Sequence, residues 1–123
     1  MNRLIAIIVL VVGIAAGLLH DVVEATHASP EEIETIISVA EELKRERAMG
    51  VYHDDLLRSK TLFMIFYNQS LRTRNSLEAG MTQLGGHAHD LTPDKMQITH
   101  GESPRDTAKV LSRMGDAIAI RNC

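Results

Sequence analysis

The sequence has 123 residues, which is enough for one domain with a hydrophobic core and too few for two ordinary domains. Apolar residues make up 45% of the chain, and the net charge of -3 argues against a general nucleic-acid-binding protein, which would normally carry a basic face. Cys123 is the only cysteine, so an internal disulfide is excluded and nothing in the sequence calls for an oxidising compartment.

The first 19 residues differ from the rest of the chain. Behind Asn2 and Arg3, residues 4–19 carry no charged or polar side chain. As a helix this run would be about 24 Å long, short of the ~30 Å hydrocarbon core of a bilayer. We therefore expect residues 1–19 to be a membrane anchor, a signal or a buried core segment. Residues 20–123 are typical of a cytoplasmic domain, so we expect a cytoplasmic protein. The alternative is a protein anchored in a membrane through residues 4–19.

A helix is predicted from Ser29 to about Gly50. Ser29 is a good N-cap, Pro30 suits the first helical position, and Glu32 completes a capping box. The polar stretch that follows, residues 51–60, contains His53 and two aspartates. We interpret it as a solvated connection and not as a metal site, because no further ligand lies at a matching spacing.

The rest of the chain alternates between apolar runs of strand length and segments with helical spacing. The predicted elements are a strand at 61–67, a helix at 70–84, a strand at 87–91, a polar loop at 92–102, a helix at 103–115 and a strand at 117–120. Helical spacing puts apolar residues on the buried side of both helices: Leu77, Met81 and Leu84 in the first, and Ala108, Leu111 and Met114 in the second. The first of these strands is apolar throughout, which is typical of a parallel strand covered on both faces. The order predicts an α/β fold, a three-layer βαβαβ half of a doubly wound parallel sheet preceded by a helix.

Polar and basic residues follow two of the predicted strands. In open parallel sheets, ligands bind beyond the carboxyl ends of the strands. Ser70, Arg72 and Thr73 lie where a strand leads into a helix, whose first N–H groups and dipole favour an anion. Arg121 ends the third strand. Together they indicate an oxyanion or phosphate site, although an N-capping serine with surface arginines would give the same local pattern. Arg74 is expected to brace the site or a neighbouring subunit.

At this point the sequence resembles a known family. Ser70-Leu-Arg-Thr-Arg74, after an apolar strand and before Asn75-Ser76-Leu77-Glu78, resembles the Ser-Thr-Arg-Thr-Arg signature of aspartate and ornithine carbamoyltransferases. The resemblance covers residues 20–123 and continues through Gln83-Leu-Gly-Gly-His-Ala88, Gln97-Ile-Thr-His-Gly-Glu-Ser103, Arg105-Asp106-Thr107-Ala108 and Asp116-Ala-Ile-Ala-Ile-Arg121. The His-Gly-Glu-Ser version of the loop is most like the knotted carbamoyltransferase-like members.

The resemblance implies an N-terminal domain that binds carbamoyl phosphate, in a protein that transfers the carbamoyl group to an amino-acid amine. It implies six substrate-binding residues: Ser70, Leu71 (through its backbone), Arg72, Thr73, Gln97 and Arg121. Arg72 and Arg121 are the expected catalytic residues, because charge builds on the carbonyl oxygen and on the departing phosphate. Gln97 would reach the site of an adjacent subunit in a homotrimer. No metal or cofactor is expected.

The resemblance also implies parts that lie beyond Cys123. The family's His-Pro-x-Gln segment and its amino-acid-binding domain follow this region, so the domain is expected to be truncated. We expect the chain to bind carbamoyl phosphate weakly without turning over alone, which leaves its status as an enzyme uncertain. A non-catalytic interaction or regulatory module that retains the fold is the alternative. Two departures from the family pattern are Leu71 in place of Thr and Gly101 where ornithine enzymes often have Lys.

The strand at 87–91 carries a His-x-His pattern, His87 and His89, followed by Asp90. Alternation along a strand puts both rings on one face, where a metal could use them. Because the sequence offers no further metal ligands at a matching spacing, a structural or surface role of these histidines is favoured.

Overall fold

The computed structural model describes residues 29–121, apart from the side chains of residues 98 and 99. The apolar segment 1–19, predicted as an anchor, signal or core segment, lies outside the described residues. Within residues 29–121, no helix is both long enough and apolar enough to cross a membrane.

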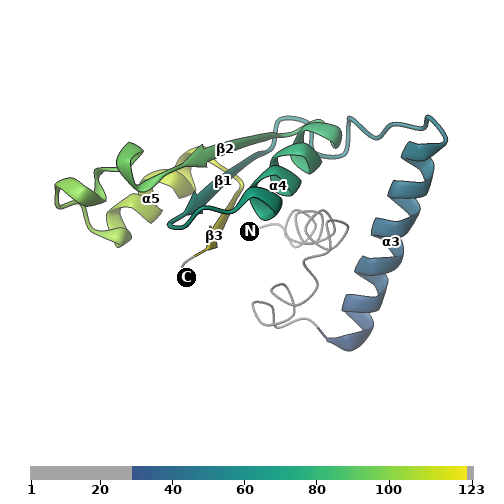
Figure 1. Ribbon diagram of the computed structural model, residues 1–123, viewed down its shortest axis with the longest axis horizontal. Helices are drawn as coiled ribbons and strands as arrows, with labels where there is room; N and C mark the ends of the chain where they lie inside the picture. The colour runs from purple at the N-terminus through teal and green to yellow at the C-terminus, as the bar shows by residue number, and fades with distance from the viewer. Residues whose placement is uncertain (1–28, 122–123) are drawn as a thin grey trace.

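The first described helix, α3 (Pro30–Ala48), begins as the sequence predicts. The Ser29 hydroxyl accepts a hydrogen bond from the Glu32 N–H (3.2 Å), and the Glu32 carboxylate accepts one from the Ser29 N–H (2.9 Å). The capping box is therefore complete, and it satisfies N–H groups that the start of a helix leaves without intrahelical partners. In Figure 1, α3 stands to one side of the sheet and its helices.

Three parallel strands form the sheet, in the order β2-β1-β3. They are β1 (Thr61–Phe66), β2 (His87–Leu91) and β3 (Ala117–Arg121). The central strand β1 is buried from Leu62 to Phe66, as expected for a strand covered on both faces. The parallel α/β fold predicted from the sequence is confirmed.

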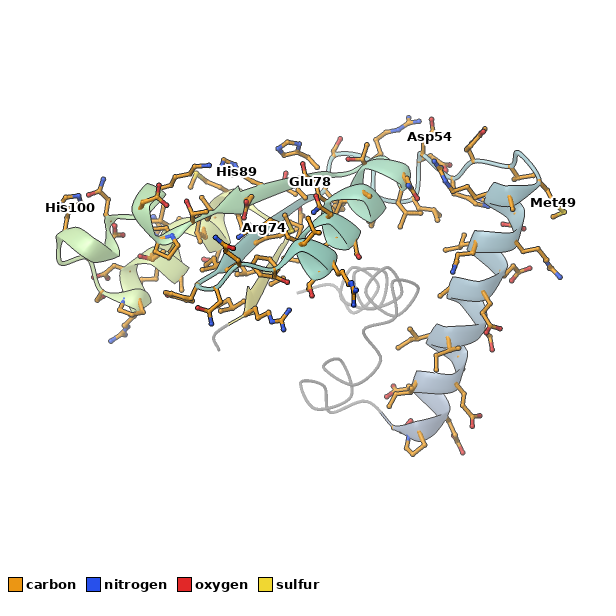
Figure 2. All side chains as sticks on the ribbon, in the orientation of Figure 1. Met49, Asp54, Arg74, Glu78, His89 and His100 are labelled. Atoms are coloured by element: carbon orange, nitrogen blue, oxygen red, sulfur yellow. The ribbon has the colours of Figure 1, made fainter. Side chains whose placement is uncertain are left out.

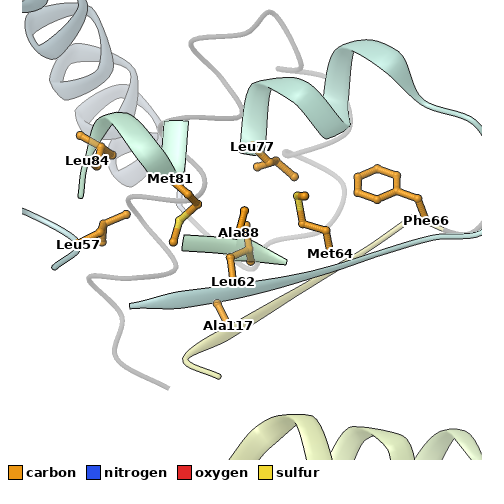
Figure 3. Packing of buried hydrophobic residues seen from close by; sticks show 9 residues of the cluster. All are labelled: Leu57, Leu62, Met64, Phe66, Leu77, Met81, Leu84, Ala88 and Ala117. Carbon is orange, nitrogen blue, oxygen red and sulfur yellow. The ribbon is translucent and has the colours of Figure 1, made fainter. Parts of the chain in front are cut away.

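Helices cover both faces of this sheet. On one face, α4 (Leu71–Gln83) packs over Leu62, Met64 and Phe66, with its own Leu77 and Met81 in the same cluster. Figure 3 shows this layer, with α4 on one side of β1 and another helix on the far side. The far layer is α5 (Pro104–Met114), whose Leu111 packs with Phe63 and Ile65. Neighbouring residues of β1 thus point to opposite layers.

Two details of α5 and the loop before it differ from the predictions. The predicted polar loop contains two short 3-10 helices, η1 (Pro93–Lys95) and η2 (Gln97–His100), and Met96 between them is buried. In α5, Leu111 is buried, whereas the predicted core residues Ala108 and Met114 are exposed. Three residues further along a helix means a rotation of about 300°, so positions 108 and 114 lie about 60° to either side of Leu111.

The connection between α3 and β1 is more than a solvated linker. Leu57 is almost fully buried, and its N–H donates to the carbonyl of Leu84 at the end of α4 (2.7 Å). Four polar residues of the segment are exposed, namely Asp54, Asp55, Arg58 and Ser59. His53 is half-buried and pairs with the Glu46 carboxylate of α3. Residues 29–121 hold no cluster of three or more His, Cys, Asp or Glu side chains suited to a metal.

Candidate anion site at the start of α4

The first turn of α4 lies beyond the carboxyl end of β1, at the edge of the sheet where ligands of parallel α/β folds bind. Ser70 occupies the N-cap position with an extended backbone (φ -146°, ψ 96°), yet its hydroxyl makes no capping hydrogen bond. The first N–H groups of α4 are therefore left without a side-chain cap. Such groups, together with the positive end of the helix dipole, favour an anion.

Arg121 joins the end of β3 to this turn. Its Nη1 donates hydrogen bonds to the Ser70 hydroxyl (2.8 Å) and to the Thr73 hydroxyl (3.0 Å). The backbone also connects the two segments, because the Tyr67 N–H donates to the Arg121 carbonyl (3.2 Å). Residues that are about 50 positions apart in the sequence thus form one group, because parallel pairing sets Phe66 beside Arg121. We refer to Ser70, Leu71, Arg72, Thr73 and Arg121 as the cradle.

The remaining cradle residues differ in exposure. Leu71 is 79% exposed, and it is the first residue of α4. Arg72 is also exposed, and its side chain makes no ion pair or hydrogen bond with any residue between 29 and 121. Its guanidinium is therefore available to an incoming anion. A planar, always charged fork is well suited to phosphate oxygens.

Arg74 takes no part in the cradle. Its Nε lies 3.3 Å from a carboxylate oxygen of Asp90 on β2, and its guanidinium carbon lies 5.1 Å from the centre of the Phe66 ring. The sequence left open whether Arg74 braces the site or a neighbouring subunit; within this chain it contacts the sheet below its own helix. Figure 2 shows Arg74 at the start of α4, between the helix and the strands.

Gln97 lies outside the cradle of this chain. It is exposed and begins η2, which packs against η1 and α5. His100 at the end of η2 lies far from Arg74 in Figure 2. A role for Gln97 in the site of another subunit stays a prediction.

The sequence did not predict the partners of Arg74. The sequence pattern groups Asp90 with the histidines of β2, although strand alternation places it on the same face as Ala88, which packs under α4. The histidines point to the opposite face, where the His89 ring lies 5.7 Å from Phe63 and 6.4 Å from the ring of His87. Side chains alternate between the two faces along a strand, and this alternation in the sequence already indicates that Asp90 points away from His87 and His89.

The fold and the cradle together define a parallel α/β domain with a candidate oxyanion site at the carboxyl edge of its sheet. The profile of the carbamoyl-P binding domain of aspartate/ornithine carbamoyltransferases matches residues 20–123. The chain belongs to this family, and the matched region is its carbamoyl-phosphate-binding domain.

Similar proteins agree with this assignment. The ornithine carbamoyltransferase of Methanospirillum hungatei is 48% identical over 101 residues, which are 82% of this chain and 33% of that protein. Among solved structures, ornithine carbamoyltransferase from Pyrococcus furiosus superimposes with a TM-score of 0.69 at 48% identity, over 74% of this chain and 29% of that one. Aspartate transcarbamoylase from Trypanosoma cruzi in complex with carbamoyl phosphate superimposes with a TM-score of 0.71 at 27% identity. The match covers 78% of this chain and 31% of that one. The chain thus spans about a third of the length of the relatives it matches. The likeness to knotted members stays a prediction.

Proposed function

We propose that the cradle holds the phosphate group of carbamoyl phosphate. Ser70 and Thr73 supply hydroxyls, the backbone of Leu71 supplies an N–H group, and Arg72 supplies a free guanidinium. The observation that carries the proposal is the position of Arg121, whose Nη1 already bonds to two cradle hydroxyls and whose charge therefore faces the same small volume. Arg121 would contact the carbonyl oxygen of the carbamoyl group or a phosphate oxygen.

In the complete protein, we propose that this site serves carbamoyl transfer to an amino-acid amine. The amine attacks the carbamoyl carbon, the bond to the bridging oxygen breaks, and phosphate leaves. Arg72 and Arg121 act as catalytic residues by stabilising the negative charge that grows on the carbonyl oxygen and on the departing phosphate. No step of this scheme calls for a metal or a cofactor. Holding the reactant in a productive geometry supplies a further part of the rate.

We propose ornithine as the acceptor. Identity supports this choice: the ornithine carbamoyltransferases from Pyrococcus furiosus and Thermus thermophilus are 48% and 41% identical to this chain, and aspartate transcarbamoylases from Trypanosoma cruzi only 27–28%. We further propose a cytoplasmic homotrimer in which Gln97 reaches the cradle of an adjacent subunit. The exposure of Gln97 supports that arrangement, as does the position of η2, whose last residue His100 lies far from Arg74 in Figure 2.

Calorimetric titration of the chain with carbamoyl phosphate, and separately with inorganic phosphate, tests the site. Arg72→Ala is expected to weaken binding about thirtyfold, because a charged hydrogen-bond donor to an anion contributes roughly 2 kcal/mol. Arg113→Ala is the matched control, since Arg113 is an exposed arginine in the last turn of α5. Equal affinities of Arg72→Ala and the unaltered chain would contradict the assignment, as would the absence of heat with millimolar ligand.

Leu71 permits a separate test of the backbone contact. Leu71→Thr is expected to change the affinity less than about threefold, because the side chain is exposed and the proposed donor is the N–H group. Leu71→Pro removes that donor while retaining the helix, since proline is well tolerated at the first helical position. We expect it to weaken binding about tenfold with an unchanged circular dichroism spectrum. Binding by Leu71→Pro at full strength would exclude the backbone contact.

A further inference from the structure

A cation occupies a position of α4 that faces the sheet. Arg74, Leu77 and Met81 follow the three- and four-residue spacing of one helical face, and both of the apolar members are buried in the cluster over β1. Arg74 continues this face by one turn toward the cradle. Its side chain is only 25% exposed, so it lies between the helix and the sheet and not in solvent.

An anion occupies the matching position of β2. Asp90 is paired in register with Met64, and Ala88, two residues earlier on β2, packs in the α4 cluster with Met64. The Asp90 side chain is 28% exposed and lies under α4, 3.3 Å from Arg74. Because successive strand residues alternate between faces, this carboxylate points into the layer that contains the cradle and away from His89.

The first turn of α4 is thereby held on two sides. On one side, Arg121 of β3 donates to Ser70 and Thr73. On the other side, Asp90 of β2 holds Arg74, whose guanidinium also lies over the Phe66 ring. Thr73 and Arg74 are consecutive residues of the first turn of α4. A shift in the contact of Thr73 with Arg121, or in that of Arg74 with Asp90, would therefore move the same backbone N–H groups and the backbone of Arg72.

Stability alone gives a poor reason for this ion pair. Among the residues that the structure describes, neither the buried Nε of Arg74 nor the buried Oδ1 of Asp90 has a hydrogen-bond partner. A largely buried pair with incompletely satisfied polar atoms contributes little to stability compared with two well-packed apolar residues. What the pair does supply is an attraction that holds the first turn of α4 close to β2.

We propose that Asp90 is a positioning residue of the carbamoyl-phosphate site. It holds the Arg74 guanidinium against the sheet, and this contact sets the orientation of the first turn of α4 and of its phosphate-binding groups. It also keeps the charge of Arg74 neutralised, so that the ligand meets Arg72 and Arg121. The inference rests on the proposed function, because it assigns a purpose to Asp90 only if the cradle binds phosphate.

The test compares Asp90→Asn, Asp90→Glu and the control Glu78→Gln, which removes one negative charge from the exposed side of α4. Two quantities are measured well below the unfolding temperature of every variant. The first is the set of backbone amide signals of residues 71–73 in ligand-free protein by NMR. The second is the affinity for carbamoyl phosphate and for inorganic phosphate by titration.

Asp90→Asn is expected to shift the amide signals of residues 71–73 and to weaken binding of both ligands about tenfold, because small displacements of positioning groups are costly. Asp90→Glu should recover most of the affinity, and Glu78→Gln should match the unaltered chain. If Asp90→Asn does not fold, Arg74→Lys makes the same comparison, because lysine retains the charge but not the planar fork over Phe66.

Other results would overturn the inference. Unchanged amide signals and affinity in Asp90→Asn, with only a lower unfolding temperature, would make the pair a plain stabilising contact. Tighter binding by Asp90→Asn would mean that a released Arg74 serves the ligand, which is the opposite of the proposed role. If the unaltered chain binds neither ligand, the proposed function fails, and the ligand-free amide signals still decide whether Asp90 orients the turn.

Discussion

Arg121→Ala is expected to weaken carbamoyl phosphate binding at least about a hundredfold, a loss of roughly 3 kcal/mol, because two contributions disappear together. One is the positive charge at the end of β3 that would face the ligand. The other is the pair of hydrogen bonds to Ser70 and Thr73, which hold the cradle to the sheet. The loss should therefore exceed that of Arg72→Ala, since the Arg72 side chain has no hydrogen-bond or ion-pair partner among residues 29–121 and would lose only its contact with the ligand.

Arg121→Lys separates these two contributions. Lysine restores the charge, but its compact ammonium group lacks the planar array of donors that lets one side chain contact both hydroxyls and an anion. We expect an affinity between those of Arg121→Ala and the unaltered chain. Titration with carbamoyl phosphate measures this order, and circular dichroism checks that each variant is folded. An Arg121→Ala variant that binds no more weakly than Arg72→Ala would contradict the double role.

Gly85→Ala is expected to be strongly destabilising. Gly85 follows α4 with φ at +86°, a conformation that side chains other than glycine rarely adopt. A Cβ atom built there would lie 1.8 Å from the Asp54 carbonyl oxygen, a backbone atom that cannot move aside as the end of a flexible side chain can. Strain and collision together should cost about 3 kcal/mol and lower the melting temperature by roughly 15 °C.

Gly50→Ala is the matched control for this prediction. Gly50 follows α3 with nearly the same backbone angle, φ +84°, but a Cβ atom there would meet nothing within 4 Å. It therefore carries the conformational cost without the collision, about 1 kcal/mol. Thermal unfolding followed by circular dichroism compares the two variants. Equal melting temperatures would show that the contact between residues 54 and 85 does not constrain the fold.

The order of elements could be predicted because local patterns specify it. Ser29 and Glu32 define the start of α3, and the apolar run from Thr61 defines the central strand with both faces covered. Helical spacing also placed Leu77 and Met81 in the core. These signals act over a few residues, so the tertiary structure did not have to be known. In α5, helical spacing wrongly predicted that Ala108 and Met114 are buried. This short helix buries only Leu111, because only a narrow part of its surface contacts the sheet.

The sequence by itself also placed Ser70, Arg72 and Thr73, the residues of the proposed anion site, at a strand-to-helix junction, where the structure has them. It could suggest Arg121 as a partner only through the rule that parallel strands end at one edge. The hydrogen bonds from Arg121 to Ser70 and Thr73, and the contact between Arg74 and Asp90, required the tertiary structure. Strand order and register decide which distant side chains meet, and those depend on how the whole sheet packs.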